Sequence, residues 1–260
     1  MGEDLVLTEI GDGVGTLLLN RPPVNALGSD LLLAVEAKLL DWVENTEIRC
    51  VVISAQGEKI FSAGADIKEI QNALGTHAAR ELVERGHSVF RHIETFPKPV
   101  VAALNGHALG GGLELAMACH MRLAREGARV ALPEINLGIM PGFGGTYRLT
   151  KICGMGSALR LVLTGEQVPA AELVGAGLIH RVFPKESFED QVKEFAAGIA
   201  AKAPIALREA MKAVVTASNA DPERAYKGEV EGFCVLAGTA DAQEGLSALL
   251  EKREPKFKGR

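Results

Sequence analysis

Three glycines and a glutamate near the middle of the chain have the spacing of a site for a negatively charged oxygen. An apolar run over residues 99–104 is followed by glycines at 110–112 and by the helix-favouring residues 113–118. A strand, a glycine turn and a helix direct free backbone N–H groups at a ligand oxygen. Glu114 falls within the first helical turn, beside these donors. Taken alone, the pattern fits a closely packed turn equally well.

A second turn and a second carboxylate occur elsewhere in the chain. Ala65 ends the run over residues 61–65, and Asp66, with Glu69 three positions later, predicts a helix that starts with a capping box. The N–H of Ala65 is therefore expected at the end of a strand, just before a helix. Glu134 lies in a glycine-rich segment between two prolines, where a solvated loop is expected.

Together these residues could serve chemistry at a carbonyl oxygen. Two convergent N–H groups suit an oxyanion, and Glu114 and Glu134 suit proton transfer around it. The sequence lacks a Gly-x-Ser-x-Gly elbow, a Walker loop and a His-Glu-x-x-His helix. It therefore does not carry the motifs typical of α/β-hydrolases, NTPases and zinc proteases. The spacing by itself leaves this combination as one hypothesis beside that of packed turns.

Strands and helices alternate in the part of the chain that carries these residues. Residues 5–10 and 14–19 predict a β-hairpin around a Gly-Asp-Gly turn, and residues 50–54 predict a buried strand. Ser29 is expected to cap a helix that has an apolar stripe at helical spacing. That stripe consists of Leu32, Val35, Leu39, Trp42 and Val43.

A long helix is predicted over residues 76–95. Its three histidines, His77, His87 and His92, miss the i, i+4 spacing of a metal pair and are expected at the surface or as caps. The residues of this helix that are expected to contribute to the core are Ala79, Leu82, Val83, Phe90 and Ile93.

The rest of the chain becomes increasingly helical. After residue 146, helices dominate, and the order of elements predicts an α/β body over residues 1–185 and a helical C-terminal region over residues 186–260, without a flexible linker. Short strands are expected at residues 121–124, 129–132 and 178–183, and the last helices at residues 204–217, 222–236 and 241–253.

Composition narrows the function classes. The chain has 260 residues, of which 47% are hydrophobic and 23% charged, enough for a globular protein with an ample core. A net charge of −5 without a basic stripe argues against nucleic-acid binding, and no apolar run reaches the roughly 18 residues that span a bilayer. Four scattered cysteines argue against zinc and against a disulfide framework. No leader sequence is recognisable, so the cytoplasm is the expected compartment.

Three segments resemble the signature blocks of the crotonase superfamily. They are Phe61-Ser-Ala-Gly-Ala-Asp-Ile-Lys68, Asn105-Gly-His-Ala-Leu-Gly-Gly-Gly-Leu-Glu114 and Pro133-Glu-Ile-Asn-Leu-Gly-Ile-Met-Pro-Gly-Phe-Gly-Gly-Thr146. Residues 21–27 and residues 244–257 resemble the flanking signatures, so the resemblance covers essentially the whole chain in order. The type that it resembles most is enoyl-CoA hydratase.

The resemblance implies an α/β fold, a crotonase-like spiral of ββα turns with a helical C-terminal region, and a homo-oligomer that is a trimer or a hexamer. It implies that the N–H groups of Ala65 and Gly111 hold a thioester oxygen, helped by the dipole of the helix that starts at Gly111. Glu114 would bind and deprotonate a water molecule, and Glu134 would exchange the proton at C2. The resemblance implies no metal and no redox cofactor, and CoA is part of the substrate rather than a cofactor.

The resemblance also implies contacts to the CoA portion of the substrate. The Ala63 carbonyl would lie near the adenine amino group, with Lys59 and Lys68 near the phosphates. Phe233 and Lys252 would reach the CoA from the C-terminal helices of the same or a neighbouring chain. Solvated surface is the alternative for the three lysines.

Four positions depart from the common pattern of the superfamily. His120 stands where an aspartate is frequent, which calls a structural ionic contact into question. Leu249 stands where an aromatic residue often lies against the adenine. Phe143 and Leu132 are bulkier or more apolar than their counterparts in many relatives, which would shape the acyl-chain preference.

The expected function is therefore that of an enoyl-CoA hydratase, a lyase of fatty acid metabolism, acting on short or medium trans-2-enoyl-CoA thioesters. The presence of both glutamates favours hydration, because many isomerases of the superfamily keep only one. Hydration of a cyclic dienoyl-CoA and double-bond isomerisation are alternatives at the same site. A distant alternative is RNA binding, which the acidic charge balance opposes.

Overall fold

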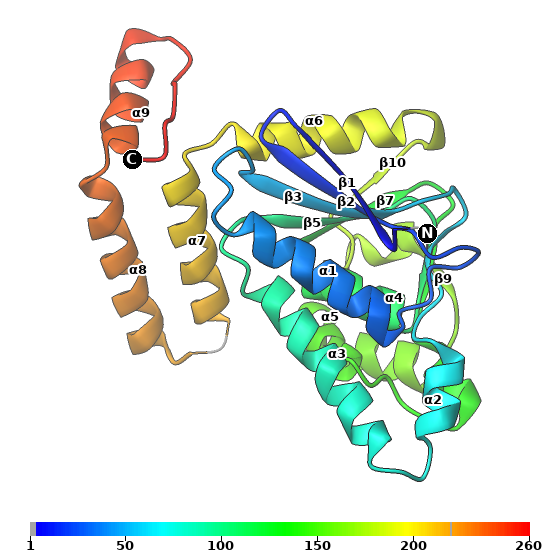
Figure 1. Cartoon of the computed structure of the whole chain (residues 1–260). Helices are drawn as coiled ribbons and strands as arrows, with labels where there is room; N and C mark the ends of the chain where they lie inside the picture. The colour runs from blue at the N-terminus through cyan, green and yellow to red at the C-terminus, as the bar shows by residue number, and fades with distance from the viewer. Residues whose placement is uncertain (1–3, 219) are drawn as a thin grey trace.

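The structure, a computed structural model, describes residues 4–218 and 220–260. In this part of the chain a six-stranded sheet has the order β1-β2-β3-β5-β7-β10, and helices cover both of its faces (Figure 1). Its strands are β1 (Val6–Gly11), β2 (Val14–Leu19), β3 (Cys50–Ala55), β5 (Val100–Leu104), β7 (Met121–Arg125) and β10 (Arg181–Phe183). A smaller sheet contains β4 (Ile60–Ser62), β6 (His107–Leu109), β8 (Arg129–Ala131) and β9 (Val168–Pro169).

Helices follow most of these strands, which confirms the predicted α/β class. Within the described residues, none of them is both long and apolar enough to cross a membrane. They are α1 (Ser29–Trp42), α2 (Ile67–Ala73), α3 (Ala78–Glu94), α4 (Gly111–Ala118), α5 (Gly145–Thr164), α6 (Phe188–Ala200), α7 (Pro204–Ala217), α8 (Pro222–Ala237) and α9 (Ala240–Glu251), with the short 3-10 helices η1 (Pro133–Leu137), η2 (Ala170–Leu173) and η3 (Lys185–Ser187).

The predicted N-terminal hairpin is confirmed. Strands β1 and β2 pair antiparallel with Gly11 opposite Val14, and Asp12 and Gly13, with φ of 51° and 76°, form the two-residue turn. Positive φ at both positions gives a turn whose twist matches that of the strands. The remaining pairings of the main sheet are parallel, and each therefore needs a crossover connection.

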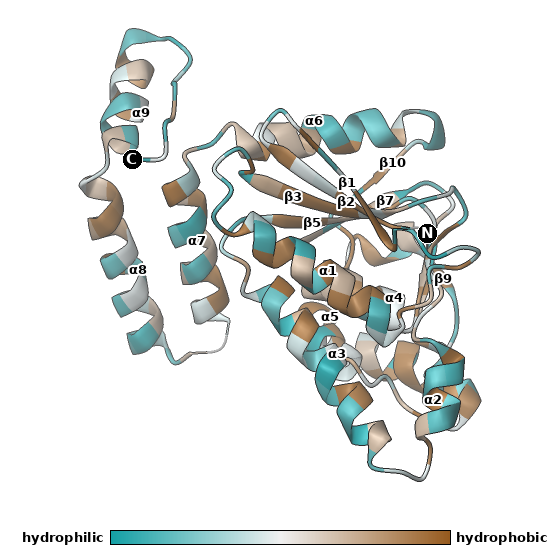
Figure 2. Cartoon of the chain, viewed as in Figure 1, coloured by the Kyte–Doolittle hydropathy of each residue, from teal (hydrophilic) through white to brown (hydrophobic). Residues whose placement is uncertain are grey.

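Strand β3 shows why this sheet is apolar on both faces. Val51 and Ile53 point into the cluster that includes residues of α1 and α3, whereas Cys50 and Val52 point into the cluster that includes residues of α6. Successive side chains of a strand face opposite sides, so a strand covered by helices on both sides is hydrophobic throughout. Figure 2 shows the strands of the sheet as predominantly hydrophobic.

The apolar stripe predicted for α1 is confirmed, but its cap is not Ser29. Leu32, Val35, Leu39 and Trp42 are buried, and Val43 packs against the same cluster. Gly28 is the N-cap residue and Ser29 is the first residue of the helix.

A side chain of α2 takes the place of that cap. The Glu69 carboxylate accepts hydrogen bonds from the Ser29 backbone nitrogen, at 3.0 and 3.1 Å, and from its hydroxyl at 2.8 Å. Asp66 caps α2 as predicted, accepting from the Lys68 nitrogen at 2.9 Å. The second half of the predicted capping box is therefore wrong, because Glu69 serves the neighbouring helix. This contact ties the segment that follows Ala65 to α1.

The last three helices leave the body of the molecule as an arm. Helix α6 packs on the main sheet, whereas α7 packs against α8 and α8 against α9, and Figure 1 shows the three projecting away from the sheets. The predicted helices of this region are confirmed, and the division of the chain at residue 185 stays a prediction. Exposed apolar side chains on the arm are Val214, Tyr226, Val230, Phe233, Val235, Leu246, Leu249 and Leu250.

Candidate active site

Two backbone N–H groups lie close together where the segment after β4 meets the start of α4. Gly111 is the first residue of α4, and a Cβ placed on it would stand 3.1 Å from the nitrogen of Ala65. Within the described residues, neither N–H has a backbone acceptor. The positive end of the α4 dipole adds to their attraction for a negative oxygen. The pair has the arrangement of an oxyanion hole.

Two glycines allow this close approach. Gly110, the N-cap of α4, has a φ of +52°, and a Cβ there would stand 2.6 Å from Oε1 of Glu134. Gly64 has a φ of +103°, and a Cβ there would stand 3.3 Å from the nitrogen of Gly111. Other residues avoid such φ values, so both conformation and space call for glycine.

Glu114 lies buried in the first turn of α4, with 2% of its surface exposed. Its Oε1 accepts hydrogen bonds from the backbone nitrogens of Phe143, at 2.8 Å, and Gly145, at 2.7 Å. Burial and then the charge of Glu134 raise the pKa of Glu114 to about 7, although the two N–H donors act in the opposite direction. A carboxyl group that titrates near neutral pH is suited to acid–base chemistry.

Glu134 lies in the 3-10 helix η1 and is partly buried, so the prediction of a solvated loop is wrong. Pro133 starts this turn, and Gly138, in the left-handed conformation, ends it. The side chain thereby turns inward, and its Oε2 is buried without a hydrogen-bond partner among the described residues. Burial raises the pKa of Glu134.

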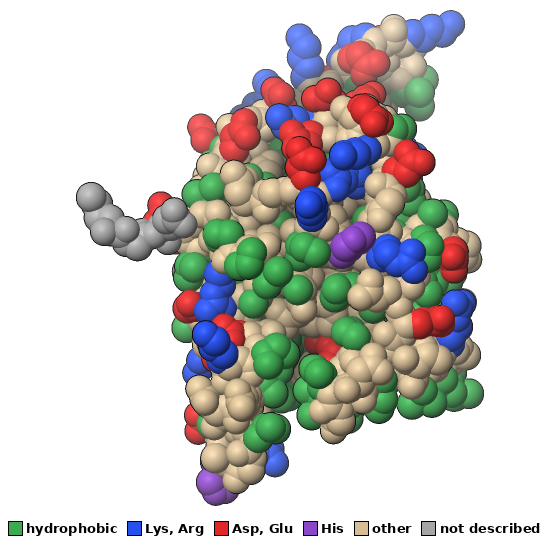
Figure 3. Space-filling model, turned by 90° about the vertical axis from the view of Figure 1, so that its right-hand side faces the viewer, with side chains coloured by type: hydrophobic (Ala, Val, Ile, Leu, Met, Phe, Trp, Pro, Cys, Tyr) green, Lys and Arg blue, Asp and Glu red, His purple; other side chains and the backbone are tan. Residues whose placement is uncertain are grey.

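Both carboxyl groups and Ala65 line one pocket of about 560 Å³. Hydrophobic side chains border the cleft on the face shown in Figure 3. The pocket wall comes from α2, from α3 and from the segment that leads into α5. Its apolar members are Ile70, Ala73, Leu74, Ala79, Leu82, Val83, Ile139, Met140, Pro141 and Phe143.

The apolar face of α3 is divided between the core and this pocket. Phe90 and Ile93 are buried in the core, as predicted. Ala79, Leu82 and Val83 instead line the pocket, so their prediction as core residues is wrong. Periodicity identifies the apolar face of a helix but does not distinguish a packed face from the wall of a cavity.

The three histidines of this region have different surroundings. His77 precedes α3 without a side-chain capping bond, and the His92 ring contacts the carboxylate of Glu36. His87 is exposed but lines the pocket, beside Gly144. No cluster of three or more potential metal ligands occurs among the residues that the structure describes.

The residues predicted to bind CoA fall into two groups. Lys59, Ala63 and Lys68 are exposed and lie on the segment that also carries Ala65. Phe233, on α8, and Lys252, which ends α9, are exposed on the arm. Neither lines the pocket, and Figure 1 places α8 and α9 on the opposite side of the molecule from α2. Within this chain the structure therefore does not bring the two groups together.

The His120 ring makes hydrogen bonds to uncharged backbone groups. Its Nδ1 accepts a hydrogen bond from the Val100 nitrogen at 2.9 Å, and its Nε2 lies 3.3 Å from the backbone oxygen of Glu94, to which it can donate. Burial lowers the pKa of His120 to about 4, in keeping with an uncharged ring. At this position the structure therefore has hydrogen bonds to the backbone rather than an ion pair.

The other three unusual positions are placed differently from one another. Leu249 is 75% exposed on α9. Phe143 is buried and lines the pocket, whereas Leu132 is buried in the core and does not line it.

Three residues hold Glu114 in place, a role that was not predicted for them from the sequence. Phe143 and Gly145 donate to Glu114, and Arg148 donates to the Phe143 carbonyl at 2.9 Å. Gly144 and Gly145 start helix α5, and free N–H groups at a helix start attract a carboxylate. The two glycines before a helical segment were the available signal, but nothing in the order of residues connects them to a glutamate some thirty positions earlier.

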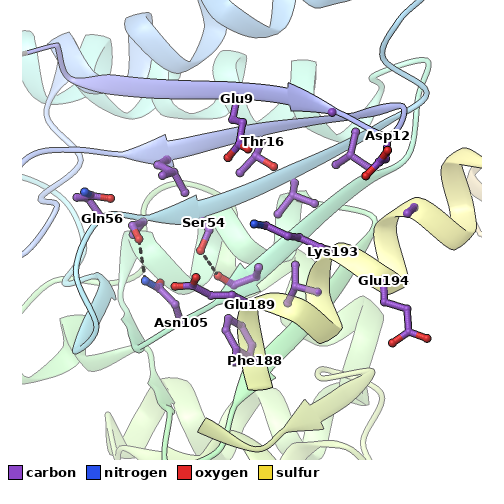
Figure 4. Close-up of a pocket in the computed structure, with 18 of the residues that line it drawn as sticks. Glu9, Asp12, Thr16, Ser54, Gln56, Asn105, Phe188, Glu189, Lys193 and Glu194 are labelled. Atoms are coloured by element: carbon purple, nitrogen blue, oxygen red, sulfur yellow. Dashed lines mark hydrogen bonds between the residues drawn. The ribbon is translucent and has the colours of Figure 1, made fainter. Parts of the chain in front are cut away.

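A second hollow, of about 600 Å³, lies between the main sheet and α6 (Figure 4). Its lining residues come from β1, β2, β3, β5 and α6, and its charged members include Glu9, Asp12, Glu189, Lys193 and Glu194. None of the residues predicted for catalysis or for CoA binding lines it. The chemistry of the candidate site is therefore concentrated in the other pocket.

Comparisons with known proteins identify the family of the chain. The family model described as enoyl-CoA hydratase/isomerase matches residues 9–260. The chain is 41% identical to a probable enoyl-CoA hydratase of Bacillus subtilis, over 95% of each chain, and 39% identical to a crotonyl-CoA hydratase of Syntrophomonas wolfei, over 99% of each. A crystal structure of an enoyl-CoA hydratase from Bacillus anthracis superposes with a TM-score of 0.94 at 36% identity, covering 98% of this chain and 100% of the other.

Proposed function

The chain belongs to the enoyl-CoA hydratase/isomerase family and is an enoyl-CoA hydratase, and we propose that its oxyanion hole and the two glutamates that line its pocket carry out the reaction. The observation that carries this proposal is their convergence on one pocket. Ala65, Glu114 and Glu134 line that pocket, and Gly111 adjoins Ala65. The reaction adds the hydroxyl of water to C3 of a trans-2-enoyl-CoA and hydrogen to C2.

The thioester oxygen accepts hydrogen bonds from the N–H groups of Ala65 and Gly111. These bonds polarise the conjugated thioester and make C3 electrophilic. Glu114 takes a proton from water as the water oxygen bonds to C3. The electrons of the double bond move onto the thioester oxygen, and the resulting enolate is stabilised by the two N–H groups and the α4 dipole. Glu134 then delivers a proton to C2. One glutamate gains a proton and the other loses one, so transfer between them through solvent restores the site.

Hydrogen bonding decides which glutamate starts with the proton. Two like charges at short range resist ionising together, so the pair keeps one proton near neutral pH. Glu114 accepts two backbone N–H groups, which favours its ionised form. Oε2 of Glu134 has no partner within the described residues, which favours the protonated form there. This arrangement makes Glu114 the base and Glu134 the acid.

The acyl group that we propose is a neutral hydrocarbon chain of short to medium length. The pocket wall contributed by α2 and α3 is apolar. Among the described residues that line the pocket there is no Lys or Arg, which leaves His87 as the side chain that could pair with a carboxylate at the far end of an acyl chain. Neutral chains therefore fit this wall better than dicarboxylic ones.

The CoA site is completed by another copy of the chain. Lys59, Ala63 and Lys68 lie near the oxyanion segment, whereas Phe233 and Lys252 lie on the arm, remote from the pocket of their own chain. The exposed apolar side chains of the arm support association with a second copy, because such side chains avoid water. The assembly that we propose is a homo-oligomer, a trimer or a hexamer.

The reaction needs no metal or redox cofactor, because hydration involves no net transfer of electrons and backbone N–H groups stabilise the enolate. Dialysis against EDTA should therefore leave the rate unchanged. The cytoplasm is the compartment that we propose, and the four free cysteines support a reducing environment.

The decisive assay uses purified protein and crotonyl-CoA. The absorbance of the conjugated thioester should fall as water adds, and a series of longer enoyl-CoA thioesters should define the chain-length preference. No loss of absorbance with any chain length would overturn the proposal. Mass spectrometry of the product separates the alternatives, since hydration adds the mass of water and isomerisation adds nothing.

A further inference from the structure

The loop over residues 143–145, whose N–H groups bind Glu114, is itself held by a buried arginine. Arg148, in the first turns of α5, is 6% exposed. Its Nη1 donates to the Phe143 carbonyl at 2.9 Å, and its Nη2 donates to Oε2 of Glu94, at the end of α3, at 3.1 Å. The guanidinium thus connects α3 to the segment whose N–H groups point at Glu114.

The packing around this loop leaves little freedom. A Cβ on Gly144 would stand 2.4 Å from Nη1 of Arg148. The Phe143 ring meets the Phe90 ring edge to face, with centroids 5.7 Å apart, and a Cβ on Gly86 would stand 2.2 Å from the Phe143 ring. A displacement of Arg148 would break the hydrogen bond that fixes the Phe143 carbonyl beside the two donors to Glu114.

We infer that Arg148, paired with Glu94, is a positioning residue for the catalytic base: it holds the 143–145 loop so that two N–H groups face Glu114, and its positive charge favours the ionised carboxylate. This inference rests on the proposed function of Glu114. Glu94 limits the effect of Arg148, because it places a negative charge on the far side of the guanidinium. The two residues are thus expected to influence Glu114 in opposite directions.

Within the described residues, the other charged or titratable groups around Glu114 come from η1, α3 and α5. Glu134 of η1 faces it and opposes its ionisation. His87 of α3 and Tyr147 of α5 line the same pocket. Arg148 lies on α5 and attracts the ionised form of Glu114. Substitution of Glu134 or His87 would alter the pocket itself, so Arg148 and Glu94 offer the cleaner test.

The test compares pH profiles of kcat/KM for hydration of crotonyl-CoA in three variants. In Arg148→Met, loss of the positive charge should move the acidic limb to higher pH by about one unit. In Glu94→Gln, loss of the negative charge should move it to lower pH. Arg148→Lys keeps the positive charge but cannot bond the Phe143 carbonyl and Glu94 with the geometry of a guanidinium. The acidic limb of this variant should therefore stay near that of the wild type while kcat falls.

The control is Arg160→Met, which removes a guanidinium paired with Glu166 near the other end of α5 and should not move the limb. A purely structural role for Arg148 predicts lower kcat in Arg148→Met and Glu94→Gln with unchanged limbs, and that result would overturn the inference. If Arg148→Met does not fold, Glu94→Gln decides: a limb at lower pH supports the inference and an unchanged limb overturns it.

A second readout separates this inference from the proposed function. Infrared titration of the Glu114 carboxyl band, identified by its loss in Glu114→Gln, reports ionisation without turnover. If the wild type hydrates no enoyl-CoA but the band shifts as described in the variants, the proposed function fails and the electrostatic role of Arg148 stands. If turnover is normal and the band does not shift, only the inference about Arg148 fails.

Discussion

At the scale of the residue, the different roles that we propose for two chemically identical glutamates follow from what surrounds them. Glu114 is tied to backbone N–H groups at the start of α5, whereas Oε2 of Glu134 lies buried without a partner within the described part of the chain. Hydrogen bonds to an ionised carboxylate stabilise it, and burial without them favours the protonated form. The environment, rather than the residue type, separates base from acid.

Replacement of either glutamate should therefore stop turnover without removing the binding site. Glu114→Gln and Glu134→Gln each lose one proton-transfer group, and kcat should fall by about 100- to 10,000-fold. Affinity for CoA, measured by calorimetry, should change little, because neither carboxyl group belongs to the segment proposed to bind the nucleotide. Near-normal kcat in either variant would contradict the assigned role.

Glu114 should also make stability depend on pH. Its pKa in the folded state is raised from 4.5 to about 7, so between these pH values the folded protein holds a proton on the Glu114–Glu134 pair that the unfolded chain releases. This contribution to stability is complete below pH 4.5 and is lost as pH rises to about 7, a change of about 3 kcal/mol. Glu114→Gln should lack this part of the pH dependence. Urea unfolding between pH 5 and 8 measures it, and parallel curves for the two proteins would exclude it.

At the scale of the element, α4 combines three tasks in eight residues. Its first residue supplies one N–H of the proposed oxyanion hole, its first turn carries Glu114, and its N-terminal dipole favours negative charge. Gly110 makes this possible, because its positive φ turns the chain into the helix and its missing side chain leaves room for Glu134. The geometry of the site therefore depends on the way one helix begins.

The variant Gly110→Ala tests that dependence. Its methyl group would stand 2.6 Å from Oε1 of Glu134, so kcat should fall by about 100-fold or more, as on loss of an oxyanion donor. The matched control is Gly127→Ala, at a φ of +80° with nothing within 4 Å of the added Cβ. Both should lose about 1 kcal/mol of stability through backbone strain. Equal effects of the two variants on kcat would show that strain alone matters.

At the scale of the whole molecule, the exposed apolar surface of the arm of α7, α8 and α9 has no partner within the described part of one chain. It carries exposed apolar side chains, and it holds Phe233 and Lys252 away from the pocket of its own chain. Apolar surface of this kind is typical of contacts between subunits. Association would bury it and could bring the two residues to the CoA of another copy.

A charge on the arm should therefore disrupt the assembly. Leu250→Glu changes a side chain that is 84% exposed on α9, and the mass in solution should fall toward that of one chain, because a charge is costly to bury in an apolar interface. Leu40→Glu, on α1 and 59% exposed, is the control and should leave the mass unchanged. Light scattering after gel filtration measures both, and a single-chain mass for the wild type would refute the oligomer.

Sequence reasoning reached the main elements because their signals are local. The hairpin around Asp12 and Gly13, the stripe of α1 and the cap at Asp66 follow from the preferences of neighbouring residues. It failed for Glu69 and for Leu82, because hydrogen bonding to another helix and exposure to a cavity depend on elements distant in the chain. Local preference cannot identify such partners.

The sequence by itself determined the α/β class and the family, and it supplied the residues that we propose for the site. The glycines around Gly111 and the two glutamates stand in order along the chain, and the pattern that they share with relatives is linear. Only the tertiary structure decided that Ala65 lies beside Gly111, that α5 holds Glu114 and that Arg148 stands behind it. These relations join residues far apart in the chain, and burial and electrostatics depend on distance in space rather than along the backbone.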